Sequence, residues 1–366
     1  MRALTVIAEM GTGGAESVVA DLAGHLVATG HEACVASNGG WRADALAAGG
    51  VATLAVPLRA SGPAPLGRTV ARLRRETAAR PVDVVHAHNI RASVAAHLGT
   101  RVGRRLRPPL VTTVHGLADG DYARAVRVLS WSDLVVAVSD DVAERLTAGG
   151  LGPARLRVVE NAVPPPTDPD VRDQVRDQVR SELGLDASSR VVLCVARLAP
   201  PKRIDLLLET WADVPGATLL VAGDGPDRDA LVRHAEPLPR VRFLGERHDV
   251  ARLLAAADML VLPSDREGLP MAVLEAMAAG VPVVASAVGG IPQLGADAVE
   301  LVAPRCADAL AAGVRRVLDD PDRRGVLVVA GRALAERRFS SERMQSEYDS
   351  VYEVVRKGGP SVVTNA

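Results

Sequence analysis

Cysteine is rare in this sequence, where it occurs only at positions 34, 194 and 306 of 366. The number is odd, the three residues lie far apart, and no Cys-x-x-Cys pattern is present. A disulfide framework or a structural zinc site would need closely patterned cysteines, so neither is indicated. We therefore expect a reduced, cytoplasmic protein.

Long hydrophobic runs are also missing, because no apolar stretch approaches the length that spans a bilayer. The apolar stretch within residues 1–8 is short and runs into glycines without a small-residue cleavage site, so we interpret this start as a first strand and not as a signal peptide. With 48% hydrophobic residues, the chain can still fill the cores of two ordinary α/β domains.

An excess of charge of one sign is lacking as well, since 43 Lys and Arg residues are balanced by 44 Asp and Glu residues. Such a chain has no global field that attracts nucleic acid, and we expect no nucleic-acid partner. Lysine occurs only at positions 202 and 357, so arginine supplies nearly all of the positive charge, part of it in two local clusters. We interpret these clusters as solvated faces, with contact to an anionic acceptor or a membrane surface as the alternative. Their members are Arg68, Arg72 and Arg75, and Arg101, Arg104, Arg105 and Arg107.

The first half of the chain begins with a strand, a glycine turn, a helix and a second strand. The strands are predicted at residues 4–8 and 31–37, with the turn at 11–16. Glu16 stands where a dinucleotide fingerprint needs its third glycine, so a nicotinamide cofactor is not indicated. Further apolar segments separated by helical or polar stretches predict a doubly wound parallel sheet. These additional strands are predicted at 82–86, 110–115 and 134–139.

Three histidines fall at the C-terminal ends of two of these predicted strands, where open α/β sheets bind ligands. They are His86, His88 and His115. A lone histidine is more often structural, and we interpret His86 and His88 in this way. No carboxylate lies at ligand spacing from the three residues, so a metal site is not favoured.

A proline-rich connector at 164–166 leads into the second half, which again alternates strands with helical segments. This pattern predicts a second doubly wound parallel sheet. Its strands are predicted at 190–196, 217–222, 241–244, 259–263, 281–286 and 300–302.

Two cations follow the first strand of this second half. Arg197 and Lys202 lie five residues apart across a proline turn. They can converge on a diphosphate, because arginine binds two oxygens in a fork and lysine adds a point charge. Asp227 and Asp229 form an Asp-x-Asp pattern, but they stand at a helix start, where acidic residues cap. We therefore assign them no metal.

The most informative stretch is 264–280, which leaves an apolar strand, turns, and becomes a helix between Pro270 and Gly280. Glu275 is the one polar residue from 271 to 279. The helix is therefore predicted to be buried on most sides and to carry one carboxylate into the interior. Glu267 lies just before this helix, where its carboxylate and the free N–H groups of the first turn can face one ligand.

The segment "PSDREGLPMAVLEAMAAGVPVVASAVGGIPQL", with its Glu-x7-Glu pair, closely resembles the donor-site signature of the family 4 glycosyltransferases, which are retaining enzymes of the GT-B fold. A "GGxE" turn near the start is similar to the same family. So is the segment "ARLAPPKR", which matches the pattern "GRLxPxKG" at the arginine and lysine, whereas Ala196 and Arg203 replace its first and last glycines.

This resemblance implies two Rossmann-like α/β domains that face each other across a cleft. The acceptor-side domain is expected at 1–165 and the donor-binding domain at 166–340, with a helix at 341–357 packing back onto the first domain. The implied activity is transfer of a hexose or N-acetylhexosamine from a UDP-sugar to a hydroxyl or amine of a small-molecule or lipid-linked acceptor. Natural-product and cell-envelope glycosides are the expected products.

The resemblance also implies roles for individual residues, and it implies no metal cofactor, because cations offset the charge of the leaving diphosphate. The nucleoside diphosphate sugar is then the co-substrate. The residues expected in catalysis are His115, Glu267, Arg197 and Lys202. Those expected to bind the donor are Gly13, Gly14, Arg197, Lys202, Gly268, Leu269, Pro270, Met271 and Glu275.

Two other functions stay open on the sequence. A nucleotide-sugar 2-epimerase can share this two-domain fold, although Arg197 and Lys202 together with the Glu-x7-Glu pair favour transfer. A non-catalytic sugar-nucleotide binding module is the other alternative. Gln293 leaves room for it, because many members of the family have glutamate after "GGIP".

Overall fold

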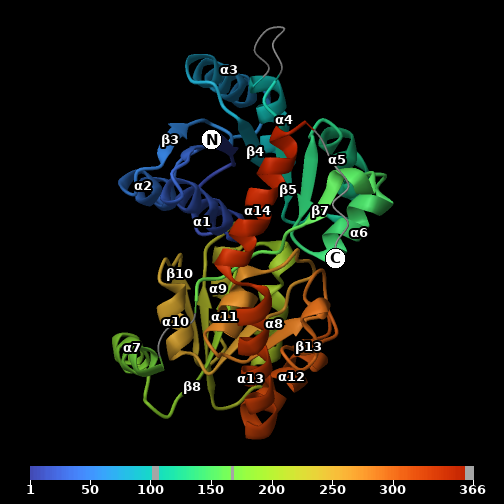
Figure 1. Cartoon of the computed structure of the whole chain (residues 1–366). Coiled ribbons are helices and arrows are strands. Elements are labelled where there is room, and N and C mark those ends of the chain that lie inside the picture. The colour runs from blue at the N-terminus through green and yellow to red at the C-terminus, as the bar shows by residue number, and fades with distance from the viewer. Residues whose placement is uncertain (101–106, 166–168, 359–366) are drawn as a thin grey trace. The chain divides into compact units, whose positions relative to one another are not determined.

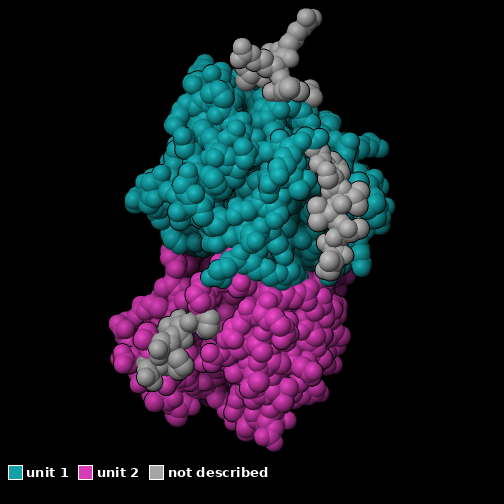
Figure 2. Space-filling view, viewed as in Figure 1, with its two compact units in different colours: residues 1–161, 342–366 teal, residues 162–341 magenta. Residues whose placement is uncertain are grey.

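The computed structural model describes residues 1–100, 107–165 and 169–358. The chain forms two compact units (Figure 2). Unit 1 comprises Met1–Asn161 and Glu342–Ala366, and unit 2 comprises Ala162–Ser341. The chain therefore passes between the units twice. Among the described residues, no helix is long and apolar enough to cross a membrane.

Unit 1 is built on a parallel sheet of seven strands in the order β3-β2-β1-β4-β5-β6-β7. Strands β3, β4, β5 and β7 of this sheet are labelled in Figure 1. The central strands are buried along their whole length, as expected for a parallel sheet covered on both faces. The bounds are β1 Arg2–Val6, β2 Glu32–Ser37, β3 Ala52–Ala55, β4 Val84–His88, β5 Leu110–Val114, β6 Leu134–Ala137 and β7 Leu156–Val158.

The helices of unit 1 follow the strands in alternation, except for the last one, α14, which returns from the end of the chain. Tyr348 and Tyr352 of α14 are buried and hydrogen-bond to side chains of β4 and β5, so α14 lies across these two strands. The helices are α1 Gly14–Ala28, α2 Trp41–Ala48, α3 Pro63–Ala79, α4 Ile90–Gly99, α5 Tyr122–Leu129, α6 Asp140–Ala148 and α14 Ser341–Arg356, with short 3₁₀ turns at Asp119–Asp121 and Pro153–Arg155.

Unit 2 contains a parallel sheet of six strands in the order β10-β9-β8-β11-β12-β13. The strands are β8 Arg190–Val195, β9 Ala217–Ala222, β10 Val241–Gly245, β11 Met259–Leu262, β12 Val283–Ser286 and β13 Glu300–Val302. The helices are α7 Pro169–Glu182, α8 Ile204–Trp211, α9 Arg228–Ala235, α10 Val250–Ala256, α11 Met271–Ala278, α12 Ala307–Asp319 and α13 Pro321–Arg338, with 3₁₀ turns at Pro200–Lys202 and Pro292–Leu294.

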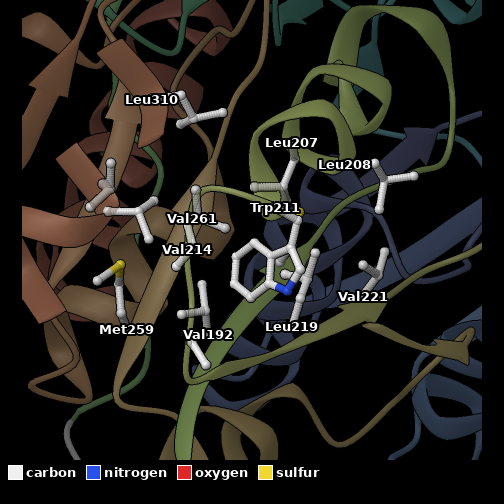
Figure 3. Close-up of a cluster of buried hydrophobic side chains, with 14 of the residues drawn as sticks. Val192, Leu207, Leu208, Trp211, Val214, Leu219, Val221, Met259, Val261 and Leu310 are labelled. Atoms are coloured by element: carbon white, nitrogen blue, oxygen red, sulfur yellow. The ribbon is translucent and has the colours of Figure 1, made fainter. Parts of the chain in front are cut away.

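The buried cluster around the sheet of unit 2 is mostly aliphatic and includes the indole of Trp211, and Phe243 packs against it while partly buried. Figure 3 shows the indole of Trp211, from α8, against Val192 of β8 and Leu219 of β9. Burying this ring and the surrounding branched side chains removes a large apolar area from water, at about 25 cal/mol per Å². The same cluster includes Cys194 of β8 and Leu198, so it packs around the end of β8 from which the cation-bearing turn departs.

The doubly wound architecture predicted for both halves is confirmed, but the sequence interpretation missed two strands of unit 1. β3 is mostly exposed, and β7 spans only three residues, of which two are partly exposed and Val158 is exposed, so neither is buried like a central strand. Both are edge strands. The predicted strand at 82–86 is also shifted, since β4 runs from Val84 to His88.

The structure describes the first of the two arginine clusters completely and the second only at Arg107. Arg68, Arg72 and Arg75 are exposed on α3, in agreement with a solvated face. Arg101, Arg104 and Arg105 lie outside the described residues. Arg107 donates to the carboxylate of Asp133 at 3.0 Å, so it anchors the start of β5 within unit 1.

Candidate active site

In unit 2, β8 and β11 are neighbours although β9 and β10 lie between them in the sequence. The chain therefore winds away from β8 in one direction and from β11 in the other. Ligands of open α/β sheets bind at such a switch point, beyond the C-terminal ends of the strands. The Arg197 and Lys202 segment follows β8, and the Glu267 segment follows β11. Sequence and topology thus bring both segments to one place.

Lys202 and Glu267 form the centre of this site. Nζ of Lys202 donates to Oε1 of Glu267 at 2.6 Å, and Oγ of Ser264 donates to the same oxygen at 2.6 Å. The Glu267 side chain is only 7% exposed, and Ser264 is fully buried. A carboxylate so well covered needs donors. Both donors hydrogen-bond to the same carboxylate oxygen, Oε1 of Glu267.

The turn that carries Lys202 contains a strained residue. Arg203 has φ 50° and ψ 42°, which is the left-handed conformation that glycine adopts without cost. The left-handed conformation explains why the family pattern "GRLxPxKG" has glycine at this position. In this chain the Arg203 side chain makes ion pairs with Asp205 at 3.1 Å and with Asp265 at 3.3 Å. These contacts tie the Lys202 turn to the segment that precedes Glu267.

Two glycines after β12 hold the backbone of the Glu267 segment. Gly289 has φ 56°, and a Cβ added there would lie well inside 3.0 Å of the carbonyl oxygen of Glu267. The N–H of Gly290 donates to the carbonyl oxygen of Gly268 at 2.7 Å. Backbone packs directly on backbone at this point, so the position of Glu267 depends on the absence of a side chain at 289.

The Arg197 segment is supported in the same way by the turn after β9. A Cβ added at Gly223 or Gly225 would collide with the carbonyl oxygen of Ala196 or Leu198, respectively. The N–H of Leu198 donates to the carbonyl oxygen of Asp224 at 2.9 Å. Arg197 itself is exposed, and its guanidinium makes no hydrogen bond or ion pair with the residues that the structure describes. It lies at the same strand end as the Lys202 turn and is free to reach an anion.

The helix α11 differs from its prediction in one respect. Its buried face consists of Val273, Leu274, Ala276, Met277 and Ala278. Glu275 is partly exposed and shares the opposite face with Met271, four residues earlier. The helix is buried on most sides, as predicted, but the prediction that Glu275 carries its carboxylate into the interior was wrong, because apolar residues on a partly exposed helix face give the same sequence pattern as buried ones. Gly268, Leu269 and Pro270 are buried in the turn before the helix.

In unit 1 the corresponding switch point lies between β1 and β4. Gly13 caps α1 after β1, and both Gly13 and Gly14 leave backbone accessible, since Gly13 is exposed and Gly14 is partly exposed. The carboxylate of Glu16 turns back so closely that a Cβ at Gly13 would collide with it. The N–H groups of the first turn of α1 follow directly after these glycines. Such N–H groups at a helix N-terminus can bind an anion.

The three histidines form a connected group at β4 and β5. Nδ1 of His88 lies 2.9 Å from Nε2 of His115, and the rings of His86 and His88 lie 4.2 Å apart between centroids. His86 bonds to the hydroxyls of Tyr352 and Thr113, both at 2.8 Å. The structure thus places His86 inside β4 and not at its end, and it supports the structural interpretation of that residue.

Burial is the largest influence on the pKa values of these histidines. It lowers the pKa of His86 to about 3 and that of His115 to about 4, and it lowers the pKa of His88 well below its usual range. Repulsion from neighbouring histidines adds to the effect for His86 and His88. All three rings are therefore neutral near pH 7, and they cannot act as cations toward a phosphate.

A pH effect on stability follows from these pKa values. An unfolded chain protonates its histidines near pH 6.5, whereas the folded chain keeps His115 neutral down to about pH 4. Between these values the unfolded state binds more protons, so stability falls as the pH falls, by about 1.4 kcal/mol per pH unit for each such histidine. We expect urea unfolding to show a marked loss of stability from pH 7 to pH 5.

The variant His88→Asn should reduce this pH dependence by the contribution of one histidine. His234→Gln is the matched control, because His234 is exposed on α9. That variant should leave the slope unchanged. Equal slopes for wild type and His88→Asn would contradict the assignment of the effect to buried histidines.

Several residues of the two sites were missed by sequence reasoning. Ser264 could have been recognised from its place at the end of an apolar strand, three residues before Glu267. The partners Tyr348 and Tyr352 lie more than 230 residues from β4 and β5. No local sequence pattern predicts contacts between residues so far apart along the chain.

The structure also bears on the Asp-x-Asp pattern. Asp227 stands at the N-cap of α9, but its side chain makes no capping hydrogen bond, so that part of the prediction was wrong. Asp229 is in the first turn and lies 3.7 Å from Arg228, with 83% of its side chain exposed. Among the described residues, no group of three or more His, Cys, Asp or Glu side chains could hold a metal ion.

Comparisons with known proteins match both units. Residues 12–165 match the family model described as "Glycosyltransferase Family 4", and residues 189–320 match that described as "Glycosyl transferases group 1". The D-inositol 3-phosphate glycosyltransferase of Mycobacterium tuberculosis is 36% identical over 250 residues, which cover 60% of this chain and 50% of that protein. The chain thus spans about half the length of the curated relatives it matches.

Two solved structures share the fold across almost the whole chain. HepE of Anabaena, solved in complex with UDP-glucose, superposes with a TM-score of 0.84 at 23% identity and covers 96% of this chain and 99% of its own. Sucrose-phosphate synthase of Thermosynechococcus elongatus gives a TM-score of 0.81 at 20% identity, with 98% and 100% covered.

Two all-parallel, doubly wound units with candidate site residues at their switch points are the architecture of the GT-B fold, as predicted. With family models matching both units, the chain belongs to the family 4 glycosyltransferases. The family inferred from the sequence resemblance is thereby confirmed.

Proposed function

We propose that the chain is a retaining glycosyltransferase that moves a hexose or an N-acetylhexosamine from a UDP-sugar to a hydroxyl or amine of a small-molecule or lipid-linked acceptor. Natural-product or cell-envelope glycosides are the proposed products. Catalysis is electrostatic, since preorganised cations and N–H groups stabilise the charge that develops on the departing diphosphate. No divalent cation is required.

The observation that carries this proposal is the arrangement of Lys202, Glu267 and Arg197 at the switch point of unit 2. Lys202 is held by the nearly buried carboxylate of Glu267, so its ammonium group has a fixed position. Arg197 is exposed at the end of the same strand and has no competing partner among the described side chains. A fixed point charge and a mobile fork together suit a diphosphate.

The positions of the other residues are compatible with the roles proposed for them. Gly268, Leu269, Pro270 and Met271 lead into α11, whose first-turn N–H groups face ligands from the strand end. Glu275 is partly exposed on α11, as a carboxylate that binds ribose hydroxyls must be. Gly13, Gly14 and His115 supply backbone and imidazole donors from unit 1 for the sugar and the acceptor.

The relatives support the donor class. The mycobacterial relative is named D-inositol 3-phosphate glycosyltransferase, and HepE was solved with UDP-glucose. We extend the nucleotide-sugar donor to this chain, because the cations and Glu267 lie at the switch point where such folds bind ligands.

The test is a panel of nucleoside diphosphate sugars, incubated with the purified protein and candidate acceptors and followed by mass spectrometry. Release of a nucleoside diphosphate together with a glycosylated product supports the proposal. Anomeric analysis of that product by NMR then decides between retention and inversion. Incubation with UDP-N-acetylglucosamine alone detects a 2-epimerase, because that reaction needs no acceptor, and binding without turnover indicates a non-catalytic module.

Chelation provides a separate prediction. Turnover should persist in excess EDTA, because Lys202 and Arg197 are proposed to neutralise the charge that a divalent ion neutralises elsewhere. The measurement is the initial rate with and without EDTA, followed by addition of Mg²⁺ or Mn²⁺. A complete loss of rate that added metal restores would contradict the metal-independent mechanism. It would favour metal binding by Asp227 and Asp229.

A further inference from the structure

His88 occupies an unusual position between the structural histidine His86 and the ligand-side histidine His115. It is 2% exposed, and Nδ1 of its ring lies 2.9 Å from Nε2 of His115. The two rings are stacked, with centroids 5.2 Å apart and planes 20° from parallel. His88 therefore contacts His115 through one defined nitrogen pair.

The other nitrogen of His88 decides where the shared hydrogen lies. Nε2 of His88 is buried and has no hydrogen-bond partner among the described residues. If His115 donated to His88, the hydrogen of neutral His88 would sit on Nε2, which would be a buried N–H without an acceptor. Buried N–H groups without an acceptor are rarer than buried acceptors that lack a donor. The hydrogen is therefore placed on Nδ1 of His88, which donates to His115.

This placement fixes the tautomer of His115. Because its Nε2 accepts from His88, a neutral His115 carries its hydrogen on Nδ1. The His115 side chain is partly exposed, and its Nδ1 bonds to none of the described residues. The backbone N–H of His115 donates to Oδ1 of Asn89 at 3.3 Å, which holds the residue at the end of β5.

We infer that His88 is a positioning residue that fixes His115 in the tautomer with hydrogen on Nδ1, so that His115 offers an N–H donor to an oxygen atom of the ligand. A neutral donor of this kind suits a sugar hydroxyl or ring oxygen and does not attract the diphosphate. This consequence for binding rests on the proposed function, in which His115 contacts the donor sugar. The tautomer itself does not depend on any activity.

The first test is the tautomer in the ligand-free wild-type protein. In protein with ¹⁵N-labelled histidine, long-range ¹H–¹⁵N correlation spectra at pH 7.5 distinguish a protonated from an unprotonated ring nitrogen. The signals of His115 are assigned by their loss in His115→Gln. We expect hydrogen on Nδ1 of His115 and a bare Nε2. Hydrogen on Nε2 of His115 would overturn the inference.

Two substitutions of His88 separate positioning from simple packing. In His88→Asn, the side-chain amide can place an N–H close to the original Nδ1, whereas His88→Leu fills the site without a donor. The tautomer of His115 should persist in His88→Asn and change in His88→Leu. His97→Leu is the matched control, because His97 is another buried histidine of unit 1, stacked on Trp131. That variant should leave the His115 signals unchanged.

Ligand binding supplies the second readout. In His88→Leu, we expect the Kd for UDP-glucose to rise about five- to tenfold, as loss of one hydrogen bond predicts. The Kd for UDP alone should not change, and His88→Asn should restore the affinity for UDP-glucose. Equal weakening for UDP and UDP-glucose would overturn the positioning role. If wild type binds no UDP-sugar while the expected tautomer is observed, the proposed function fails and the tautomer assignment stands.

Discussion

Replacement of Lys202 by alanine is expected to lower kcat by about 10²- to 10³-fold, the usual cost of removing one preorganised group that stabilises developing charge. The Lys202 ammonium is fixed by a 2.6 Å contact to Glu267. The entropy of ordering this side chain is therefore lost on folding and not during the reaction. In the proposed mechanism, loss of Lys202 leaves only Arg197 and backbone N–H groups to stabilise the departing diphosphate. The KM for the donor should change less than kcat, because charge on the leaving group grows toward the transition state.

The same substitution also affects stability, and the two effects must be separated. Without Lys202, the carboxylate of Glu267 stays nearly buried and keeps one described side-chain donor, the hydroxyl of Ser264. An unpaired buried charge of this kind costs about 1–3 kcal/mol. The double variant Lys202→Met/Glu267→Gln removes both charges, so it should recover stability relative to Lys202→Ala but remain inactive.

Lys357→Ala is the matched control, because Lys357 is the only other lysine of the chain and pairs with Glu353 near the end of α14. This variant should keep wild-type activity and stability. The measurements are steady-state kinetics with the donor found in the panel and urea unfolding of each variant. A Lys202→Ala protein that folds normally and turns over at the wild-type rate would remove Lys202 from the mechanism.

The fold could be predicted well from the sequence because its central strands are continuous aliphatic runs separated by helix-length segments. Leu134–Ala137 and Met259–Leu262 are fully buried, and such runs have few alternatives in an α/β protein. The edge strands could not be found in this way. No residue of Ala52–Ala55 is buried. This strand is therefore held by its backbone pairing with β2, and burial of its own side chains contributes little.

The candidate site was predictable where one segment carries the signal and unpredictable where the contact joins distant segments. Glu267 and Lys202 were both selected from the sequence, but their 2.6 Å ion pair depends on β8 and β11 being neighbours. The contact of His88 with His115 depends in turn on the pairing of β4 with β5. The partial exposure of Glu275 was missed because residue type alone does not reveal which face of an apolar helix meets the core.

Replacement of Gly289 by alanine is expected to lower kcat/KM by about 10²-fold, because a displacement near 1 Å at a preorganised site has this effect. The new Cβ would lie well inside 3.0 Å of both the carbonyl oxygen and the carbonyl carbon of Glu267. These are backbone atoms, so the collision cannot be relieved by a side-chain rotation. The Glu267 segment must move, and the hydrogen bond between Gly290 and Gly268 must lengthen or break.

Gly216→Ala is the matched control for this prediction. Gly216 also belongs to unit 2 and has a positive φ of 80°, but a Cβ there meets no atom within 4 Å. Both alanines therefore carry the strain of the left-handed conformation, about 1–2 kcal/mol, and only the one at 289 displaces Glu267. Thermal unfolding should show similar losses of stability from this strain, with a further loss at 289. If the two variants lose equal activity, backbone strain alone explains the result and the position of Glu267 does not control catalysis.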